Sequence, residues 1–173
     1  RSDQATSGRV DQRDAWSAVK AFAHDVYTYP LPAGHKFPLG KYRLVRESAE
    51  RLPSVTVSSS RSASHDELLL VHDGVYMQRV EAGELSRREV LALGLPWSTE
   101  LVERARRSVG ATIMATEAAL SEGTAANLVG GTHHAFPDSG RGFCVYNDVV
   151  VALLAARRAG RIERAIVVDL DVH

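Results

Sequence analysis

The sequence has 173 residues, of which 45% are hydrophobic, and its 21 basic residues balance its 21 acidic residues. These values suit one domain with a hydrophobic core and argue against a disordered chain. A formal net charge of zero gives no overall field for nucleic acid or an anionic membrane, so we expect neither as a partner. The apolar run at 149–156 is too short to span a bilayer. The single cysteine, Cys144, excludes an internal disulfide and favours a reducing, cytoplasmic location.

The first part of the chain predicts alternating strands and helices. Residues 1–18 are polar and predict a disordered leader. A short apolar run predicts a strand at 19–23, and the proline- and glycine-rich stretch after it predicts an irregular loop. We expect a helix at 41–52 and a half-buried strand at 54–58, where valine alternates with small polar residues.

Capping residues predict three helices in the middle of the chain. Ser64 and Glu67 have the spacing of a capping box, and Asp73 can cap a second short helix. Ser98 can cap a long helix from 99 to 122, which places apolar residues on one face. This face is predicted to pack against the core.

The last third predicts two more strands around a helix. The stretch 124–131 (TAANLVGG) predicts a buried strand that runs into a glycine-rich turn. Asn147 or Asp148 can cap the next helix, and 165–173 (AIVVDLDVH) predicts a final strand. Because the strands alternate with helices and lack polar alternation, the pattern indicates an α/β fold with a mainly parallel sheet covered on both faces.

Three potential metal ligands occupy alternate positions of the final strand. The strand period of two would place Asp169, Asp171 and His173 on one face, at the end of the strand where parallel sheets bind ligands. Two carboxylates buried so close together would be costly without a cation, and a divalent metal removes that cost. The alternative is that the strand ends here and the three residues face solvent in a loop.

A pair of histidines follows the glycine-rich turn in GGTHHA, residues 130–135. Gly130 and Gly131 permit a tight turn, and an imidazole near pKa 6.5 can transfer protons or bind a metal. His133 and His134 are therefore candidate site residues. The alternative is that each histidine lies at the surface or forms a hydrogen bond in the core.

A third motif, GRGFCVYND at 140–148, leads from a loop into a helix. Phe143 and Tyr146 could line a pocket, although both could equally fill the core. For Asn147 and Asp148 we favour a capping role alone. No base can be assigned by spacing to the thiol of Cys144, so we expect a buried small hydrophobic residue there.

The order of these three motifs resembles the histone deacetylase family, within the arginase and deacetylase superfamily. The upstream stretches PLPAGHKFPLGKYRLVRE, LLLVHDGVY and RSVGATIMAT are similar to bacterial deacetylase-like proteins and class IV histone deacetylases. The resemblance covers residues 19–173 and implies a three-layer α/β/α fold. It also implies a zinc-dependent amidohydrolase that removes an acetyl group from lysine or from a small amine.

The same resemblance implies roles for the polar residues of the motifs. Asp171 and His173 match zinc ligands. Asp169 matches the residue that orients His133, and it can also help to hold a structural potassium ion. His133 matches the partner that stabilises charge, whereas His134 matches the general base and acid.

Two residues of the third motif match the substrate tunnel of the family. Phe143 would form one wall for the acyl-lysine stem, and Gly142 would add backbone contacts. The third zinc ligand and the carbonyl-polarising tyrosine of the family come after the position of His173. We therefore expect residues 19–173 to be the N-terminal part of a catalytic domain that is inactive and unstable alone.

Two other functions stay open from the sequence. One is an arginase-like ureohydrolase with two manganese ions, although DLDVH preceded by a histidine pair argues against it. The other is a non-catalytic fragment or pseudoenzyme that only binds acylated ligands.

Overall fold

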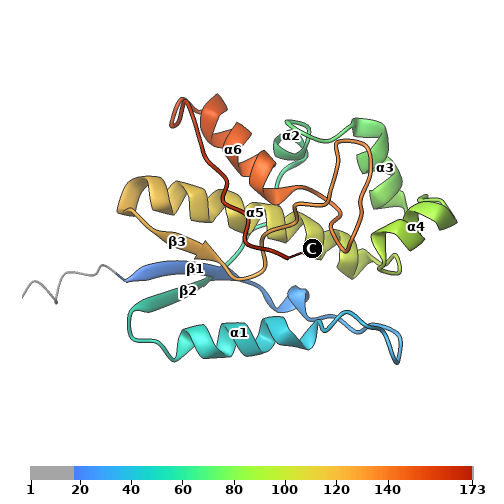
Figure 1. The fold of residues 1–173 in the computed structure, drawn as a ribbon, viewed down its shortest axis with the longest axis horizontal. Helices are drawn as coiled ribbons and strands as arrows, with labels where there is room; N and C mark the ends of the chain where they lie inside the picture. The colour runs from blue at the N-terminus through green and yellow to red at the C-terminus, as the bar shows by residue number, and fades with distance from the viewer. Residues whose placement is uncertain (1–17, 173) are drawn as a thin grey trace, which may run out of the picture.

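A small parallel sheet forms the centre of the computed structural model, which describes residues 18–172. Most of the predicted leader, and the predicted ligand His173, lie outside the described residues. The strand order is β2–β1–β3 (Figure 1). The strands are β1 (Val19–Ala23), β2 (Val55–Ser59) and β3 (Ala125–Asn127). In this sheet Val19 pairs with Val55, and Lys20 pairs with Ala125.

Helices make up most of the remaining regular structure. In chain order they are the 3-10 helix η2 (Asp25–Tyr27), α1 (Gly40–Glu50), α2 (His65–Leu68), α3 (Gly74–Ala82), α4 (Arg87–Leu93), α5 (Thr99–Glu122) and α6 (Asp148–Arg158). Within the described part of the chain, no helix combines the length and apolar character needed to cross a membrane.

The alternating side chains of β1 bury both faces of the sheet. On one face Phe22 packs with Ala111 and Ala115 of α5. On the other face Ala23 packs in a cluster with Tyr42 of α1. Helices therefore cover both faces (Figure 1), which confirms the expected α/β/α arrangement.

The main hydrophobic core lies among the helices rather than at the sheet. Helix α5 contributes Leu101, Val109 and Ile113 to it, and α6 contributes Val151 and Ala152. Its other large buried side chains come from α2, α3, α4 and the loops: Leu68, Tyr76, Met77, Val80, Leu93, Leu95 and Tyr146. The amphipathic face predicted for the long helix is confirmed at these positions.

Most predicted helix starts are confirmed by their hydrogen bonds. Ser64 and Glu67 form a reciprocal capping box, and the Asp73 carboxylate accepts from the backbone N–H groups at the start of α3. Ser98 caps α5 by accepting from the Leu101 N–H at 3.1 Å. These caps satisfy N–H groups that have no partner inside the helix.

Helix α4 was not predicted. It starts with a second capping box, in which Ser86 and Glu89 satisfy each other's backbone N–H groups, and it ends at Gly94 in a left-handed conformation. Both signals are present in the sequence, but the helix is only seven residues long and has no clear apolar periodicity.

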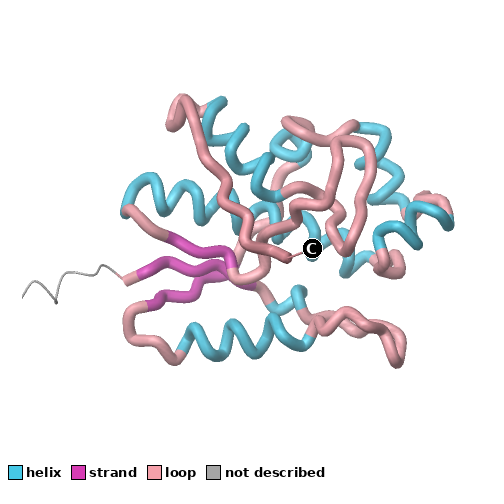
Figure 2. The backbone as a smooth tube through the Cα atoms, viewed as in Figure 1, coloured by secondary structure: helices cyan, strands magenta, loops and turns pink. Residues whose placement is uncertain are grey.

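The strand predicted at 165–173 was wrong for the described residues of that range. Residues 165–172 leave α6 as an irregular extended segment (Figure 2). Ile166 and Leu170 are 91% and 90% exposed. A strand requires a neighbour for its backbone groups, and among the described residues this segment pairs with neither β2 nor β3. The Asp169 carboxylate instead accepts a hydrogen bond from the Asp171 N–H at 2.9 Å.

Candidate functional site

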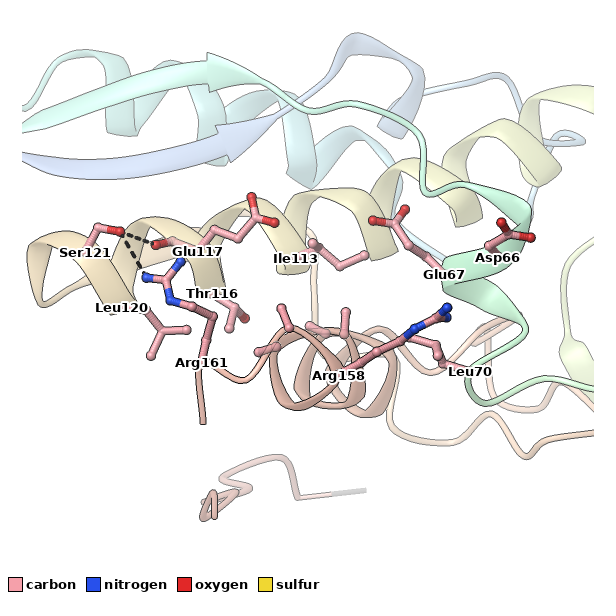
Figure 3. Close-up of a pocket in the computed structure, with 14 residues that line it drawn as sticks. Asp66, Glu67, Leu70, Ile113, Thr116, Glu117, Leu120, Ser121, Arg158 and Arg161 are labelled. Carbon is pink, nitrogen blue, oxygen red and sulfur yellow. Dashed lines mark hydrogen bonds between the residues drawn. The ribbon is translucent and has the colours of Figure 1, made fainter. Parts of the chain in front are cut away.

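Two cavities differ in the chemistry of their walls. The larger, of about 660 Å³, lies between α5 and α6 and has an alanine-rich wall with charged groups around it (Figure 3). There the Arg161 guanidinium donates to the Ser121 hydroxyl at 3.5 Å, and no histidine or cysteine lines the space. The second cavity, of about 480 Å³, lies beside the loop after β3. We call it the histidine cavity, because His133 and His134 line it together with Gly142, Phe143 and Asp171.

The histidine pair follows the carboxyl end of β3, which is where parallel sheets place ligand sites. The rings of His133 and His134 lie edge to face, with centroids 4.1 Å apart. His134 lies against Gly142, where an added Cβ would come within 3.0 Å of the imidazole Cδ2. The absence of a side chain at Gly142 therefore allows this close approach.

The segment from 169 to 171 approaches the pair from the far end of the chain. His133 Nδ1 lies 2.8 Å from Asp169 Oδ2. A carboxylate can only accept here, so Nδ1 carries the proton of this contact. Asp171 lines the same cavity. The structure thus brings together His133, His134, Asp169 and Asp171.

A complete metal site does not form from the described residues. Among residues 18–172, no group of three histidine, cysteine, aspartate or glutamate side chains could hold a metal ion. Asp171 is the one predicted ligand that can be placed, and it lies on the wall of the histidine cavity. A carboxylate is one of the ligands that zinc accepts. The described residues therefore supply one donor that fits zinc.

Phe143 is held in an unusual backbone conformation. Its φ of +69° lies in the left-handed region, which is costly for a residue with a side chain. The C-terminal end of α4 stabilises this turn, because the Ala92 and Leu93 carbonyls accept hydrogen bonds from the Gly142 and Phe143 N–H groups at 3.1 and 2.7 Å. The Phe143 ring stacks on Phe37, with centroids 4.5 Å apart.

Cys144 lies on the wall of the histidine cavity. The residue is buried, and this burial raises the pKa of its thiol. Its Sγ lies 3.4 Å from the Gly142 carbonyl oxygen. The expectation of a small buried residue is confirmed.

Arg104 is a buried cation on the wall of the histidine cavity that sequence analysis missed. Its guanidinium donates to the Tyr42 hydroxyl at 3.1 Å and lies over the rings of Phe37 and Tyr42. Within the described residues its Nε has no hydrogen-bond partner. The signal was an arginine between Leu101 and Ala105, on the face of α5 expected to be apolar.

His72 contacts the loop at 136–147 through both of its ring nitrogens. Its Nε2 accepts from the Asn147 N–H at 3.0 Å, so Nδ1 carries the proton that faces the Phe136 and Pro137 carbonyls at 3.1 and 3.3 Å. Burial lowers the pKa of His72, while these carbonyls act in the opposite direction.

Asn147 caps α6, as expected, by accepting from the Val150 N–H at 3.1 Å. Asp148 does not cap the helix, and the expectation of a capping role for it was wrong. Its carboxylate is fully buried and accepts from Thr112, Gly131 and Thr132. The neighbouring Asn147 takes the capping position, because α6 begins at Asp148 itself.

Comparison with known proteins finds relatives over most of the chain. The family model described as histone deacetylase domain matches residues 35–173. Among curated proteins, an uncharacterized protein of Picosynechococcus is 38% identical over 154 residues, which cover 87% of this chain and 51% of that protein. A histone deacetylase-like amidohydrolase of Pseudomonas aeruginosa is 33% identical over 151 residues, which cover 83% of this chain and 40% of that protein.

Solved structures show the same fold. An HDAC homolog from Aquifex aeolicus superimposes with a TM-score of 0.66 at 25% identity. The match covers 83% of this chain and 42% of that one. The chain spans about half or less of the length of these relatives.

Proposed function

Because this chain belongs to the histone deacetylase family, we propose that the whole protein is a zinc-dependent deacetylase. Its substrate is acetyl-lysine in a protein or an acetylated small amine, and the reaction is hydrolysis of the amide. One observation carries this proposal, namely that a single cavity is lined by the histidine pair, Asp171 and the Gly142–Phe143 turn. These groups come from segments far apart in the sequence.

Asp171 and His173 would hold the zinc, together with a further ligand that the described residues do not supply. The carboxylate and imidazole donors of this pair match the ligand preference of zinc. When bound, zinc supplies a Lewis acid that polarises the substrate carbonyl. Asp169 lies next to this set in the sequence, and its side chain is committed to His133 at 2.8 Å.

The histidine pair divides the movement of protons. His134 takes a proton from the attacking water and returns it to the leaving amine. His133, held by Asp169 at Nδ1, stabilises the charge that develops beside it. An aspartate that fixes both the tautomer and the ring orientation is the usual partner for such a histidine.

The walls of the cavity suit both parts of the substrate. The stacked rings of Phe37 and Phe143 offer an apolar surface for the methylene stem of lysine. Arg104 gives the same cavity a positive charge. Hydrolysis of an acetyl amide releases acetate, which is an anion. The positive charge of Arg104 would therefore attract this product within the cavity.

Two substitutions in the full-length protein test the assignment. We expect His134→Ala to lower kcat on an acetyl-lysine peptide by about 100-fold or more, because it removes proton transfer, and to leave bound zinc nearly unchanged. Asp171→Ala should lose both zinc and activity. The measurements are a peptide deacetylation assay and elemental analysis for zinc.

His65→Ala, on the exposed start of α2, is the matched control and should behave as wild type. A His134→Ala protein with wild-type turnover would contradict the role of the pair. Wild-type protein that binds the peptide without turning it over would support the binding-only alternative. Release of urea from arginine would support the ureohydrolase.

A further inference from the structure

A buried carboxylate lies directly behind the loop that carries the histidine pair. Asp148 has no exposed surface. Its Oδ1 accepts from the Thr132 N–H at 2.7 Å and from the Thr132 hydroxyl at 2.6 Å. Its Oδ2 accepts from the Gly131 N–H at 3.0 Å and from the Thr112 hydroxyl. Four donors thus replace the water that this carboxylate gives up on burial.

The loop is shaped around this carboxylate. At Gly130 an added Cβ would lie 2.7 Å from Asp148 Oδ2, so a side chain there would displace the carboxylate or the loop. The Thr132 hydroxyl also accepts from the Asp148 N–H at 3.1 Å, which ties the loop to the start of α6. The first turn of a helix favours a negative charge, so α6 also stabilises the carboxylate.

A second layer of hydrogen bonds holds the carboxylate itself. The Asn127 side-chain amide, at the end of β3, donates to the Thr112 hydroxyl at 2.7 Å and to the Ser108 carbonyl at 2.9 Å. The Thr112 hydroxyl then uses its single proton for Asp148. The strand, α5 and α6 therefore meet at this one side chain.

The carboxylate of Asp148 binds the residue that directly precedes the histidine pair. Thr132 directly precedes His133, and His134 follows. The imidazole of His133 is fixed at its other end by Asp169, and His134 lies against Gly142. Asp148 holds the backbone at Gly131 and Thr132, directly before the pair.

We propose that Asp148 is a positioning residue, which sets the orientation of His133 and His134 by holding the Gly131 and Thr132 backbone. The inference rests on the proposed function, because it concerns how the pair is held for proton transfer. A misplacement of reacting groups by about 1 Å can lower a rate about 100-fold. Loss of one of the four hydrogen bonds should therefore lower kcat, even where the protein stays folded.

Thr112 offers the sharpest test, because its side chain lies outside the lining of the histidine cavity. In the full-length protein Thr112→Val removes one donor to Asp148 at nearly constant volume, and Thr112→Ser restores it. We expect Thr112→Val to lower kcat on an acetyl-lysine peptide about tenfold, with KM changed less than about twofold. Thr112→Ser should behave as wild type.

Thr116→Val is the matched control. Thr116 lies one turn further along α5, is also partly buried, and donates to the Thr112 carbonyl at 2.8 Å. It makes no contact with Asp148 in the network described above. We expect Thr116→Val to leave kcat unchanged and to lower the melting temperature less than Thr112→Val does, because the Thr116 hydroxyl bonds a helix carbonyl and not a buried carboxylate.

A spectroscopic measurement reports on the pair without reference to activity. In the zinc-free full-length protein, the imidazole NMR signals of His133 and His134 should shift in Thr112→Val and in Asp148→Asn, but not in Thr116→Val. Equal kcat losses in the two valine variants, or unshifted imidazole signals in Thr112→Val, would overturn the proposal. If the wild type shows no deacetylation, the proposed function fails, and the imidazole signals still decide whether Asp148 positions the pair.

Discussion

His72 links the stability of the loop at 136–147 to pH. Burial lowers its pKa from the usual 6.5, so the folded protein binds this proton less readily than the unfolded chain does. The stability that depends on neutral His72 is therefore complete above pH 6.5 and is lost as the pH falls through the lowered pKa. Protonation would also turn Nε2 from the acceptor of the Asn147 N–H into a donor.

We accordingly expect the melting temperature of the full-length protein to fall between about pH 7 and about pH 5. His72→Asn should be less stable at neutral pH, because it leaves Asn147 or the loop carbonyls without their partner, and its melting temperature should depend less on pH. His65→Ala, at an exposed histidine, should keep the wild-type pH dependence. Identical slopes for the wild type and His72→Asn would assign the pH dependence to other groups.

At the scale of residues, the sequence motifs indicated which polar side chains lie close together. The structure pairs His133 with Asp169, the partner that the resemblance implies, and Asp171 lines the same cavity. Asp148 was missed because an aspartate before a helix has the pattern of a cap, and only coordinates show where its oxygens point. Arg104 was missed because helical periodicity does not show which charged residues are buried.

Helix α4 connects a local turn to the wall of the histidine cavity. Gly94 ends the helix at φ +75°, and an added Cβ would lie 2.9 Å from Phe143 Cε1. We expect Gly94→Ala to destabilise the full-length protein by about 1 to 2 kcal/mol through the left-handed conformation alone. Displacement of the Phe143 ring should then add a rise in KM for an acetyl-lysine peptide.

Gly160→Ala separates these two effects. Gly160 has a similar φ of +67°, but nothing lies within 4 Å of its missing Cβ. This variant should lose a comparable amount of stability in chemical denaturation and keep the wild-type KM. A Gly94→Ala protein whose KM equals that of Gly160→Ala would show that Phe143 does not depend on this contact.

At the scale of elements, most helix starts could be predicted because a cap is a local signal. Ser64, Ser98 and Asn147 each satisfy backbone groups within three residues of themselves. The strand at 165–173 could not be judged in the same way. A strand depends on partners that are distant in sequence, and an apolar run says nothing about whether those partners are present.

The whole molecule exposes an apolar segment that a stable isolated domain would cover. Ile166, Leu170 and Val172 are each about nine-tenths exposed, and Val168 is 75% exposed. Among the described residues, the outer edge of β3 pairs with no strand, which leaves its backbone groups exposed on that side. We therefore expect the 173-residue chain, expressed alone, to associate with itself and to show no cooperative thermal unfolding.

Light scattering and calorimetry of this chain test the expectation. Replacing Ile166, Val168 and Leu170 together by lysine should reduce the association. A control with lysine at exposed apolar positions of three helices should not reduce it, the positions being Leu44, Val75 and Leu91. A soluble monomer with one cooperative transition would contradict the prediction.

The central place of β1 has a consequence for how the chain is made. β1 leaves the ribosome before any other described strand, yet one of its two neighbours is β3, which is synthesised only after α5. The other neighbour, β2, lies closer in sequence, and contacts of short range form faster. The nascent chain therefore holds its first strand paired on one side only until β3 has been synthesised. Such an unpaired edge is the kind of surface that chaperones protect during synthesis.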